Sequence, residues 1–206
     1  MKTLVDLLHD RPTAAEFAGR YLAYLQDLLD RVSRDEIAAF IQTLLDARAR
    51  GARIFFLGNG GSAATASHFA NDLSVGTRSR SHPFRVISLT DNVSVLTAVA
   101  NDFGYEKIFS VQLKALMESG DVVVAISASG NSPNVIEAIQ WAAAHGAITV
   151  GLTGFNGGEL RRLASMSVHV PTRAGEYGPV EDLHMILDHL VGTYLQSVCD
   201  GEQVTP

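Results

Sequence analysis

Short, continuous apolar runs alternate with helix-sized segments along most of this chain, and that alternation constrains its fold more than any other feature. Runs that are apolar on successive residues suit strands buried on both faces, and the helical segments between them supply the crossovers that parallel strands need. We therefore expect an α/β fold with helices on both faces of a parallel sheet. The expected strands are RIFFL at 53–57, RVISL at 85–89, DVVVAIS at 121–127, AITVGL at 147–152 and SVHV at 167–170.

Two helices are expected before the first strand. Residues 13–31 place apolar side chains at helical spacing. A second helix follows, because Ser33 with Glu36 forms the capping-box pattern S-x-x-E and Gly51 supplies a stop. Further helices are expected at 62–74, 93–100, 106–118, 132–145, 158–164 and 179–198, with Gly146 ending the fourth of these.

The composition indicates one domain, residues 1–206, that meets other copies of itself. A chain of 206 residues is long enough for one well-buried domain and hardly for a second. Hydrophobic residues make up 47% of the chain and charged residues only 18%, which leaves few charges to cover a monomer's surface. The last residues, 199–206, are expected to form a frayed tail.

Charge and cysteine content exclude several function classes. The net charge is −6, and basic residues are scattered apart from Arg78, Arg80 and Arg85, so we expect no nucleic-acid partner. The single cysteine, Cys199, cannot form an internal disulfide, and charges interrupt the N-terminal MKTLVDLLHDRP before a signal-like apolar run develops. The apolar runs fall far below the roughly 20 residues of a membrane helix. These features predict a cytoplasmic protein that does not span a membrane.

The turn Gly58-Asn59-Gly60-Gly61-Ser62 follows the first strand directly and runs into a helix of small residues. In open parallel sheets, ligands bind where the carboxyl ends of strands meet helix N-termini. The glycines let the backbone approach a ligand closely, while Asn59 and Ser62 offer hydrogen bonds to hydroxyls or phosphate oxygens. The dinucleotide pattern G-x-G-x-x-G is absent.

The serine loop, Ser127-Ala128-Ser129-Gly130-Asn131-Ser132, follows the strongest strand. Ser132 before Pro133 is typical of a helix N-cap, so free amides and the positive end of the helix dipole face the same place as the hydroxyls, which suits a phosphate dianion. The Walker pattern is absent and the loop has no lysine, so no nucleotide cofactor is expected. Serine and glycine are also ordinary turn residues. Either turn alone is therefore weak evidence for a ligand site, and the prediction depends on the two turns together.

Both turns follow a pattern that resembles a known family. Strand-GNGGS-helix followed by strand-S-x-S-G-N-S-helix is similar to the sugar isomerase (SIS) domain, and within it to the phosphoheptose isomerase group, over about residues 15–198. The resemblance implies a flavodoxin-like three-layer αβα sandwich with a five-stranded parallel sheet over 52–198. It also implies a homotetramer in which the helices of residues 1–51 pack between subunits. The stretches that carry it are 58–73, 88–109 and 121–160.

The resemblance also implies the substrate contacts. The serines of the serine loop bind a sugar's phosphate, the first turn lies near the sugar, and the segment with Asn101 and Asp102 lies close by. The substrate-binding residues expected from these positions are Asn59, Gly60, Ser62, Asn101, Asp102, Ser127, Ser129, Asn131, Ser132 and Glu181.

Asp72 and His189 are the expected acid/base pair. The isomerases carry H-F-A-x-E-L after the first turn, with the glutamate as acid/base group, and a histidine on a late helix; here these positions are Asp72 and His189. Interconversion of an aldose and a ketose needs a base to move a proton between C1 and C2 and an acid at the oxygens, and a carboxylate with an imidazole provides both. Asp72 is the expected base, with the opposite assignment left open.

A divalent metal, commonly zinc, is bound by some members of the family. His68 and Asp72, four residues apart on one helix face, suit a shared metal as well as an ion pair, although His68 can also be a packing or capping residue. The metal hypothesis adds Glu181 and His189. Eight helical residues rise about 12 Å, so one ion reaches both only if Glu181 precedes the helix or the ligands come from different subunits.

Three departures from the family pattern bear on the substrate. Asp72 replaces a glutamate, Glu181 replaces a glutamine, and Ala128 replaces a threonine. The expected reaction is the isomerisation of sedoheptulose 7-phosphate to D-glycero-D-manno-heptose 7-phosphate through an enediol. The alternatives are a non-catalytic SIS adaptor of the type associated with replication initiation, and an isomerase of a different sugar phosphate.

Four further residues have local interpretations. His184 and Asp188 share a helix face, which indicates an ion pair rather than a metal ligand. Glu176 and Tyr177 precede the late helix, where they either touch sugar hydroxyls or cap a turn.

Overall fold

The five expected strands form a parallel sheet in the computed structural model, which describes residues 3–79 and 82–203. Each observed strand lies within one residue of its predicted bounds, so the strand predictions are confirmed. The strand order is β2-β1-β3-β4-β5. The strands are β1 (Arg53–Gly58), β2 (Arg85–Ser88), β3 (Val122–Ser127), β4 (Ile148–Thr153) and β5 (Met166–His169).

The strand order reverses between β1 and β3, which fixes where a ligand can bind. From β1 the chain crosses to β2 on one side, whereas β3, β4 and β5 follow on the other. β1 and β3 pair in parallel, with Gly58 opposite Ile126, so the turns that follow these strands emerge side by side. This is the switch point at which open α/β sheets bind ligands.

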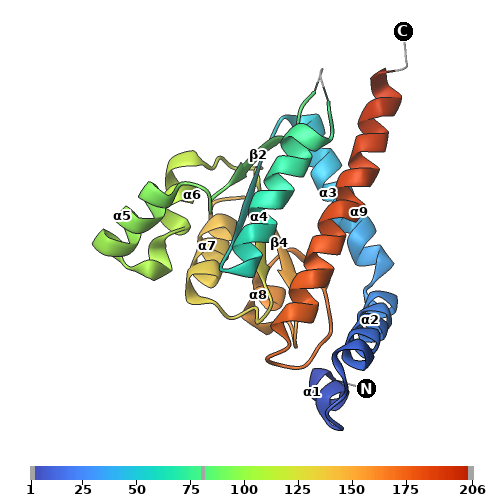
Figure 1. Cartoon of the computed structure of the whole chain (residues 1–206). Coiled ribbons are helices and arrows are strands. Elements are labelled where there is room, and N and C mark those ends of the chain that lie inside the picture. The colour runs from blue at the N-terminus through green and yellow to red at the C-terminus, as the bar shows by residue number, and fades with distance from the viewer. Residues whose placement is uncertain (1–2, 80–81, 204–206) are drawn as a thin grey trace.

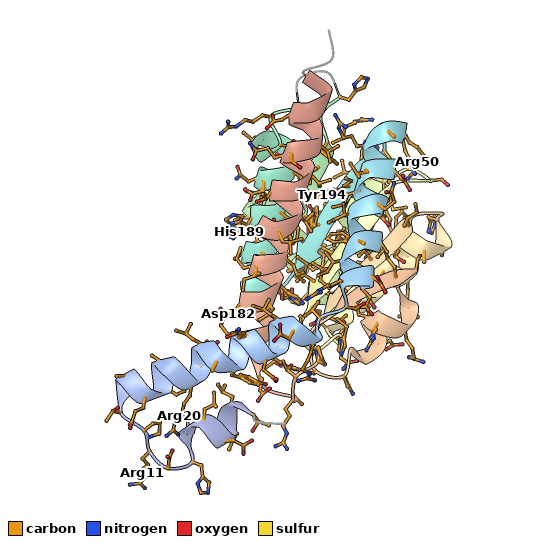
Figure 2. The ribbon with its side chains drawn as sticks, turned by 90° about the vertical axis from the view of Figure 1, so that its right-hand side faces the viewer. Arg11, Arg20, Arg50, Asp182, His189 and Tyr194 are labelled. Atoms are coloured by element: carbon orange, nitrogen blue, oxygen red, sulfur yellow. The ribbon has the colours of Figure 1, made fainter. Side chains whose placement is uncertain are left out.

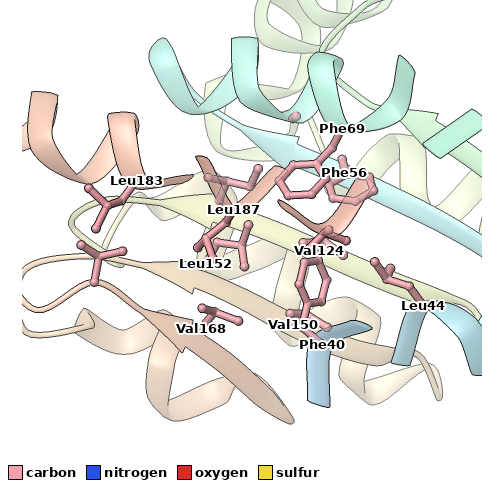
Figure 3. Close-up of a cluster of buried hydrophobic side chains, with 14 of the residues drawn as sticks. Phe40, Leu44, Phe56, Phe69, Val124, Val150, Leu152, Val168, Leu183 and Leu187 are labelled. Atoms are coloured by element: carbon pink, nitrogen blue, oxygen red, sulfur yellow. The ribbon is translucent and has the colours of Figure 1, made fainter. Parts of the chain in front are cut away.

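Helices cover both faces of the sheet, giving the expected three layers (Figure 1). Ile54 and Phe56 of β1 belong to one buried cluster and Phe55 and Leu57 to the other, because successive strand residues point to opposite faces. Figure 3 shows the first cluster, where Phe56 stacks on Phe69 with ring centroids 4.9 Å apart. Each fully buried side chain of this size contributes about 1.5–3 kcal/mol.

The helices follow the predictions with five differences. A short first helix was not expected, the segment predicted at 106–118 is broken, and the segment predicted at 62–74 ends as a π-helical turn. The helix predicted at 93–100 continues to Phe103, and the last helix is longer at both ends. The helices are α1 (Leu4–Leu8), α2 (Ala14–Arg31), α3 (Arg34–Arg50), α4 (Gly61–Asn71), η1 (π, Asp72–Gly76), α5 (Val93–Phe103), η2 (3-10, Tyr105–Lys107), α6 (Ser110–Leu116), α7 (Pro133–Ala144), α8 (Gly158–Leu163) and α9 (Tyr177–Gln203).

The cap at Ser33 forms only in part as the sequence predicts. Ser33 accepts a hydrogen bond from the backbone amide of Glu36, and Gly51 ends α3 in the left-handed region. The carboxylate of Glu36 does not reach back to the cap. It accepts from the backbone of His169 on β5 at 3.0 Å and lies 3.6 Å from Arg161, so tertiary partners take the place of the local one.

The N-terminal helices are tied to the start of α9. Glu176, just before α9, accepts hydrogen bonds from the backbone amide of Leu4 and from the Tyr24 hydroxyl, and Tyr21 donates to Asp182 at 2.6 Å. Figure 2 shows α2 reaching away from the sheet beyond these contacts. The assignment of residues 1–51 to contacts between subunits stays a prediction.

The remaining sequence predictions concern the ends and the membrane. α9 continues to Gln203, which shortens the expected tail; residues 204–206, like Arg80 of the basic stretch, lie outside the described residues. Over the ranges that the structure describes, every helix is too short or too polar to cross a bilayer.

Candidate active site

The serine loop holds a hydroxyl that its helix does not use. Ser132 is the N-cap residue of α7 with Pro133 as the first helical residue, as predicted, yet its side chain makes no capping hydrogen bond. Its Oγ lies 3.5 Å from the Oγ of Ser127, at the end of β3. Two hydroxyls therefore converge at the N-terminal end of α7, where an anion finds hydrogen-bond donors and the helix dipole. Within this turn Pro133 has no N–H, and the amide of Val135 already donates to the Asn134 side chain.

The shape of the serine loop depends on Gly130 and Asn131. Gly130 has φ +65° and packs against the backbone of Gly157, so a side chain at this position would collide with it. Asn131, expected at the substrate, donates instead to the Ser129 carbonyl and accepts from the backbone amide of Glu159 at 3.0 Å. Its side chain ties the loop to α8 and is not part of the cavity lining.

The two strand-end turns line one cavity of about 120 Å³, as the sequence predicts. This phosphate cavity has room for a group the size of a few water molecules. Tyr177, for which the sequence left two interpretations, faces it, whereas Glu176 is buried away from it and accepts from the Arg173 amide, which caps a turn. The lining residues are Asn59, Ser62, Ile126, Ser127, Ala128, Ser129, Ser132, Tyr177 and Glu181.

Asn59 connects the two turns. Its side-chain amide forms a reciprocal pair with that of Asn134 on α7, at 2.9 Å in both directions, and its oxygen also accepts from the Tyr105 hydroxyl at 3.0 Å. Gly60, the N-cap of α4, has φ +54°, a conformation that glycine adopts without strain. Asn101 and Asp102 are exposed at the end of α5 and line neither this cavity nor the one beside His189.

Glu181 faces the phosphate cavity from α9. Its carboxylate lies against the backbone of Gly61, at a place that a side chain on residue 61 would occupy. Burial, together with the neighbouring Asp182, raises the pKa of Glu181. A carboxylate therefore stands beside the expected phosphate position.

A second group of side chains lies farther along α4 and α9. The Nε2 atom of His68 is 3.6 Å from Oδ2 of Asp72, 3.6 Å from Oδ2 of Asp188 and 3.3 Å from Nε2 of His189. One ligand atom from each of the four residues lies within 4.8 Å of all the others. The expected pair Asp72 and His189 is thus brought together, and Asp188 joins it; we call these four residues the imidazole–carboxylate cluster.

Asp188 is fully buried, and neither of its carboxylate oxygens has a hydrogen-bond partner. Burial, reinforced by Asp72, raises its pKa to about 7. The predicted ion pair with His184 is wrong: His184 lies one turn earlier, its Nδ1 is unpartnered, and burial lowers its pKa to about 4. A fully buried imidazole without a charged partner stays neutral.

The metal ligands predicted from the sequence fall in two places within the single chain. Glu181 lies inside α9, which begins at Tyr177, so the condition that would bring it and His189 to one ion within a chain is not met. The cluster that can hold a metal ion has Asp188 in its place. Two imidazoles and two carboxylates are a suitable donor set for a divalent transition metal, and the unpaired oxygens of Asp188 fit such an occupant.

A cavity of about 210 Å³ opens beside Asp72 and His189 and is separate from the phosphate cavity. Gly192 of α9 lets the helix approach Asp72, since a side chain there would begin 3.6 Å from the Asp72 Cβ. Asp72 itself opens the π-helical turn η1, a distortion that is frequent at functional sites. The lining residues are Asp72, Gly76, His189, Gly192, Thr193 and Gln196.

Asp188 is the residue that sequence reasoning missed, although a signal was present. It sits on the buried face of α9, in register with Val180, His184, Val191 and Leu195, all fully buried. A carboxylate on an apolar helix face is costly unless something compensates it. That position, next to His189, is the signal in the sequence that made it a candidate functional residue.

Comparisons with known proteins agree with this geometry. The family model of the SIS domain matches residues 20–154. A phosphoheptose isomerase from Geobacter sulfurreducens is 38% identical over 182 residues, which cover 88% of this chain and 94% of the relative. The chain belongs to the phosphoheptose isomerase family of SIS-domain proteins. A second relative in this family, from Burkholderia pseudomallei, is 37% identical over 188 residues, covering 88% and 94% of the two chains.

Solved structures of phosphoheptose isomerases share the fold. The enzyme from Neisseria gonorrhoeae is 30% identical and superposes with a TM-score of 0.80, covering 90% of this chain and all of that one. The Francisella tularensis protein, at 23% identity, has a TM-score of 0.81 over the same shares. The family resemblance and the five-stranded sandwich predicted from the sequence are confirmed, and these relatives favour the isomerase over the adaptor alternative.

Proposed function

We propose that this protein is an aldose–ketose isomerase that interconverts sedoheptulose 7-phosphate and D-glycero-D-manno-heptose 7-phosphate. The observation that carries the proposal is that Asp72, directly after α4, and His189 of α9 lie in one cluster, while the N-terminal parts of α4 and α9 line the phosphate cavity. The near full-length similarity to phosphoheptose isomerases supports it.

The phosphate group is bound by the serine loop. The hydroxyls of Ser127, Ser129 and Ser132 line the phosphate cavity, and the hydroxyl of Ser132 is not used for capping α7. Hydroxyls and the positive end of the α7 dipole recognise the anion without a lysine or arginine. Asn59 and Ser62, from the other turn, are placed to contact the sugar next to the phosphate.

The reacting carbons lie toward Asp72 and His189. Ser62 and His68 are six residues apart on α4, a rise of about 9 Å, and an extended chain of seven carbons spans roughly 8 Å at about 1.3 Å per C–C bond. This separation supports a long sugar over a short one. It also gives the phosphate a purely binding role, remote from the proton transfer.

Proton transfer between C1 and C2 is assigned to the pair. The Asp72 carboxylate takes the proton from the carbon beside the carbonyl, giving an enediol, and returns it to the neighbouring carbon, while His189 moves the proton between the two oxygens. A divalent ion of the zinc type, where it is held by His68, Asp72 and His189, would supply Lewis acidity toward the sugar oxygens in place of proton transfer by His189, whose ring nitrogen would then be a ligand. The exchange of roles between Asp72 and His189 is the alternative left open above.

The protein is proposed to act as a homo-oligomer, with a tetramer as the family form. Ile186, Leu190 and Tyr194 are 37%, 44% and 50% exposed and follow one another at four-residue intervals along α9. Figure 2 shows Tyr194 on the same helix as His189. An exposed apolar stripe of this kind is suited to helix packing against a second copy.

A sugar phosphate cannot diffuse across a bilayer, which supports the cytoplasmic location expected from the sequence.

The test is turnover of purified protein with five- to seven-carbon ketose phosphates, with bound metal measured alongside. We expect the highest kcat/KM with sedoheptulose 7-phosphate, and losses of about 100-fold or more in kcat for Asp72→Asn and His189→Gln. Higher efficiency with a shorter ketose phosphate would replace the proposed substrate. No turnover of any ketose phosphate, with or without added zinc, would refute the isomerase assignment.

A further inference from the structure

The hydroxyl of Tyr105 connects the segment after α5 with the phosphate cavity. Tyr105 is the first residue of η2, its side chain is 59% exposed, and its hydroxyl donates to Oδ1 of Asn59 at 3.0 Å. Asn59 lines the cavity. Asn101, expected at the substrate, donates instead to Asp102 at 2.8 Å, and neither residue lines the cavity. In the described part of the chain, this segment therefore reaches the cavity through Tyr105.

The main chain of α7 defines which way the Asn59 amide is turned. The backbone N–H of Val135 donates to Oδ1 of Asn134 at 3.0 Å, and the reverse orientation of that amide would set a nitrogen donor against this N–H. Asn134 and Asn59 form a reciprocal pair at 2.9 Å, each nitrogen donating to the other oxygen. Reversing the Asn59 amide would oppose nitrogen to nitrogen and oxygen to oxygen. One orientation therefore satisfies all of these bonds.

One N–H of Asn59 is left for a ligand. The Asn59 oxygen accepts from Asn134 and from Tyr105, which fills both of its acceptor sites. The nitrogen donates to Asn134, and within residues 3–79 and 82–203 its second hydrogen has no acceptor. Donation to the amide oxygen strengthens the N–H donors of the same amide, because linked hydrogen bonds polarise one another. Asn59 therefore offers the phosphate cavity a donor of fixed direction.

Tyr105 is itself held in place by α7. Lys107, at the other end of η2, forms an ion pair with Glu137 at 2.7 Å, and Ser110 donates to the same carboxylate at 2.8 Å. Glu137 follows Asn134 by three residues, less than one helical turn. One helix therefore positions both groups that hold the amide.

We propose that Tyr105 is a positioning residue, which together with Asn134 holds the Asn59 amide so that its free N–H donates to an oxygen of the sugar phosphate. This oxygen belongs either to the phosphate group or to a neighbouring hydroxyl, since both are acceptors. The inference rests on the proposed function for the identity of the ligand. It is measured by binding without turnover, so either proposal can fail alone.

The experiment starts from Tyr105→Phe, which removes the hydroxyl and keeps the exposed ring. Calorimetric titration of the full-length protein with inorganic phosphate and with sedoheptulose 7-phosphate measures the Kd of each. We expect a rise in Kd of about 2- to 10-fold, the effect of one hydrogen bond. The value of kcat should stay within about two-fold, because the contact lies away from the reacting carbons. Tyr194→Phe, on another helix and lining neither cavity, should leave Kd unchanged.

The two ligands distinguish the two acceptors. A rise in Kd for both assigns the free N–H to the phosphate group, and a rise for the sugar phosphate alone assigns it to a sugar hydroxyl. An unchanged Kd for both ligands in Tyr105→Phe overturns the proposal. A melting temperature lower than that of the parent by about 4 °C or more would assign the hydroxyl a structural role instead.

A double variant tests whether Tyr105 acts through Asn59. Asn59→Ala should weaken binding at least as much as Tyr105→Phe, and the double variant should bind as Asn59→Ala does, because the hydroxyl then has no amide to hold. Additive effects of the two changes would contradict the proposal. Asn59→Asp, which keeps the oxygens and lacks the N–H donor, replaces Asn59→Ala in this comparison if the latter does not fold.

Discussion

Gly61 and Glu181 lie in direct contact near the N-terminal ends of α4 and α9, with the Glu181 carboxylate in the space that a side chain at residue 61 would fill. The contact places a negative charge in the lining of the phosphate cavity. Burial raises the pKa of this carboxyl group, which reflects the cost of holding the charge there. The Glu181 carboxylate therefore repels the phosphate anion that the serine loop attracts.

Glu181→Gln is expected to tighten the binding of inorganic phosphate by about 10-fold, since it removes the repulsion between two anions in a partly buried cavity. Isothermal titration with phosphate at pH 8 measures this. Asp200→Asn is the control, because Asp200 is an exposed acidic residue of the same helix and does not line the cavity.

Gly61→Ala tests the same contact from the other helix. The added methyl group displaces the flexible Glu181 carboxylate, so phosphate binding should again tighten while the protein stays folded. Weaker phosphate binding in both variants would mean that Glu181 supports the anion rather than opposing it.

Ser132→Ala is expected to raise the KM for the sugar phosphate by about 10-fold, the effect of one lost hydrogen bond to a charged group. Its effect on the free energy of unfolding should stay below about 0.5 kcal/mol, because the hydroxyl makes no capping hydrogen bond.

Ser33→Ala is the control for this prediction, since Ser33 caps α3 through the amide of Glu36. It should cost about 1 kcal/mol in urea denaturation and leave KM unchanged. A loss of stability in Ser132→Ala as large as that of Ser33→Ala would assign Ser132 a structural role instead.

The contribution of His184 to the free energy of unfolding is expected to fall between pH 6.5 and pH 4. Burial lowers the pKa of this imidazole to about 4, so the unfolded chain takes up a proton below about pH 6.5 while the folded chain does not. A depressed folded-state pKa gives stability that is complete above pH 6.5 and is lost as the pH falls to about 4, up to about 3 kcal/mol.

Urea denaturation of His184→Gln at several pH values tests this dependence. The variant should lose part of the slope between pH 6.5 and pH 4. His169, whose pKa burial lowers to about 4 as well, adds a contribution of the same sign, and Asp188, whose pKa burial raises to about 7, adds one of opposite sign, so the test is the difference between variant and parent. His9→Gln, at an exposed position, is the control. An unchanged slope in His184→Gln would place the acid sensitivity elsewhere.

Leu190→Lys is expected to lower the oligomeric mass, because it puts a charge in the middle of the apolar stripe formed with Ile186 and Tyr194. Light scattering after size-exclusion chromatography measures the mass at low micromolar concentration. Val93→Lys, at another exposed apolar position, should leave it unchanged. A parent protein that is monomeric at these concentrations would contradict the proposed assembly.

The layers, strands and phosphate loop were predictable because their signals are local. Continuous apolar runs such as Val122–Ile126 give strands buried on both faces, and the turns that follow them must meet at one edge of a parallel sheet. The short helix α1 was missed although Thr3 and Asp6 form a capping box there, because five residues are too few to give a periodic pattern.

The amino-acid sequence by itself determined the α/β class, the serine loop and the residue types available for acid/base chemistry, since these depend on patterns within one element or one turn. Only the tertiary structure decided which carboxylate joins the histidines. Glu181 and Asp188 occupy one helix, and the packing of α9 against α4 directs the first to the phosphate cavity and buries the second beside His68. Glu181 and Asp188 are both acidic residues of one helix, and helical rise and rotation separate their side chains. The packing of α9 against α4 determines which group of residues each carboxylate faces.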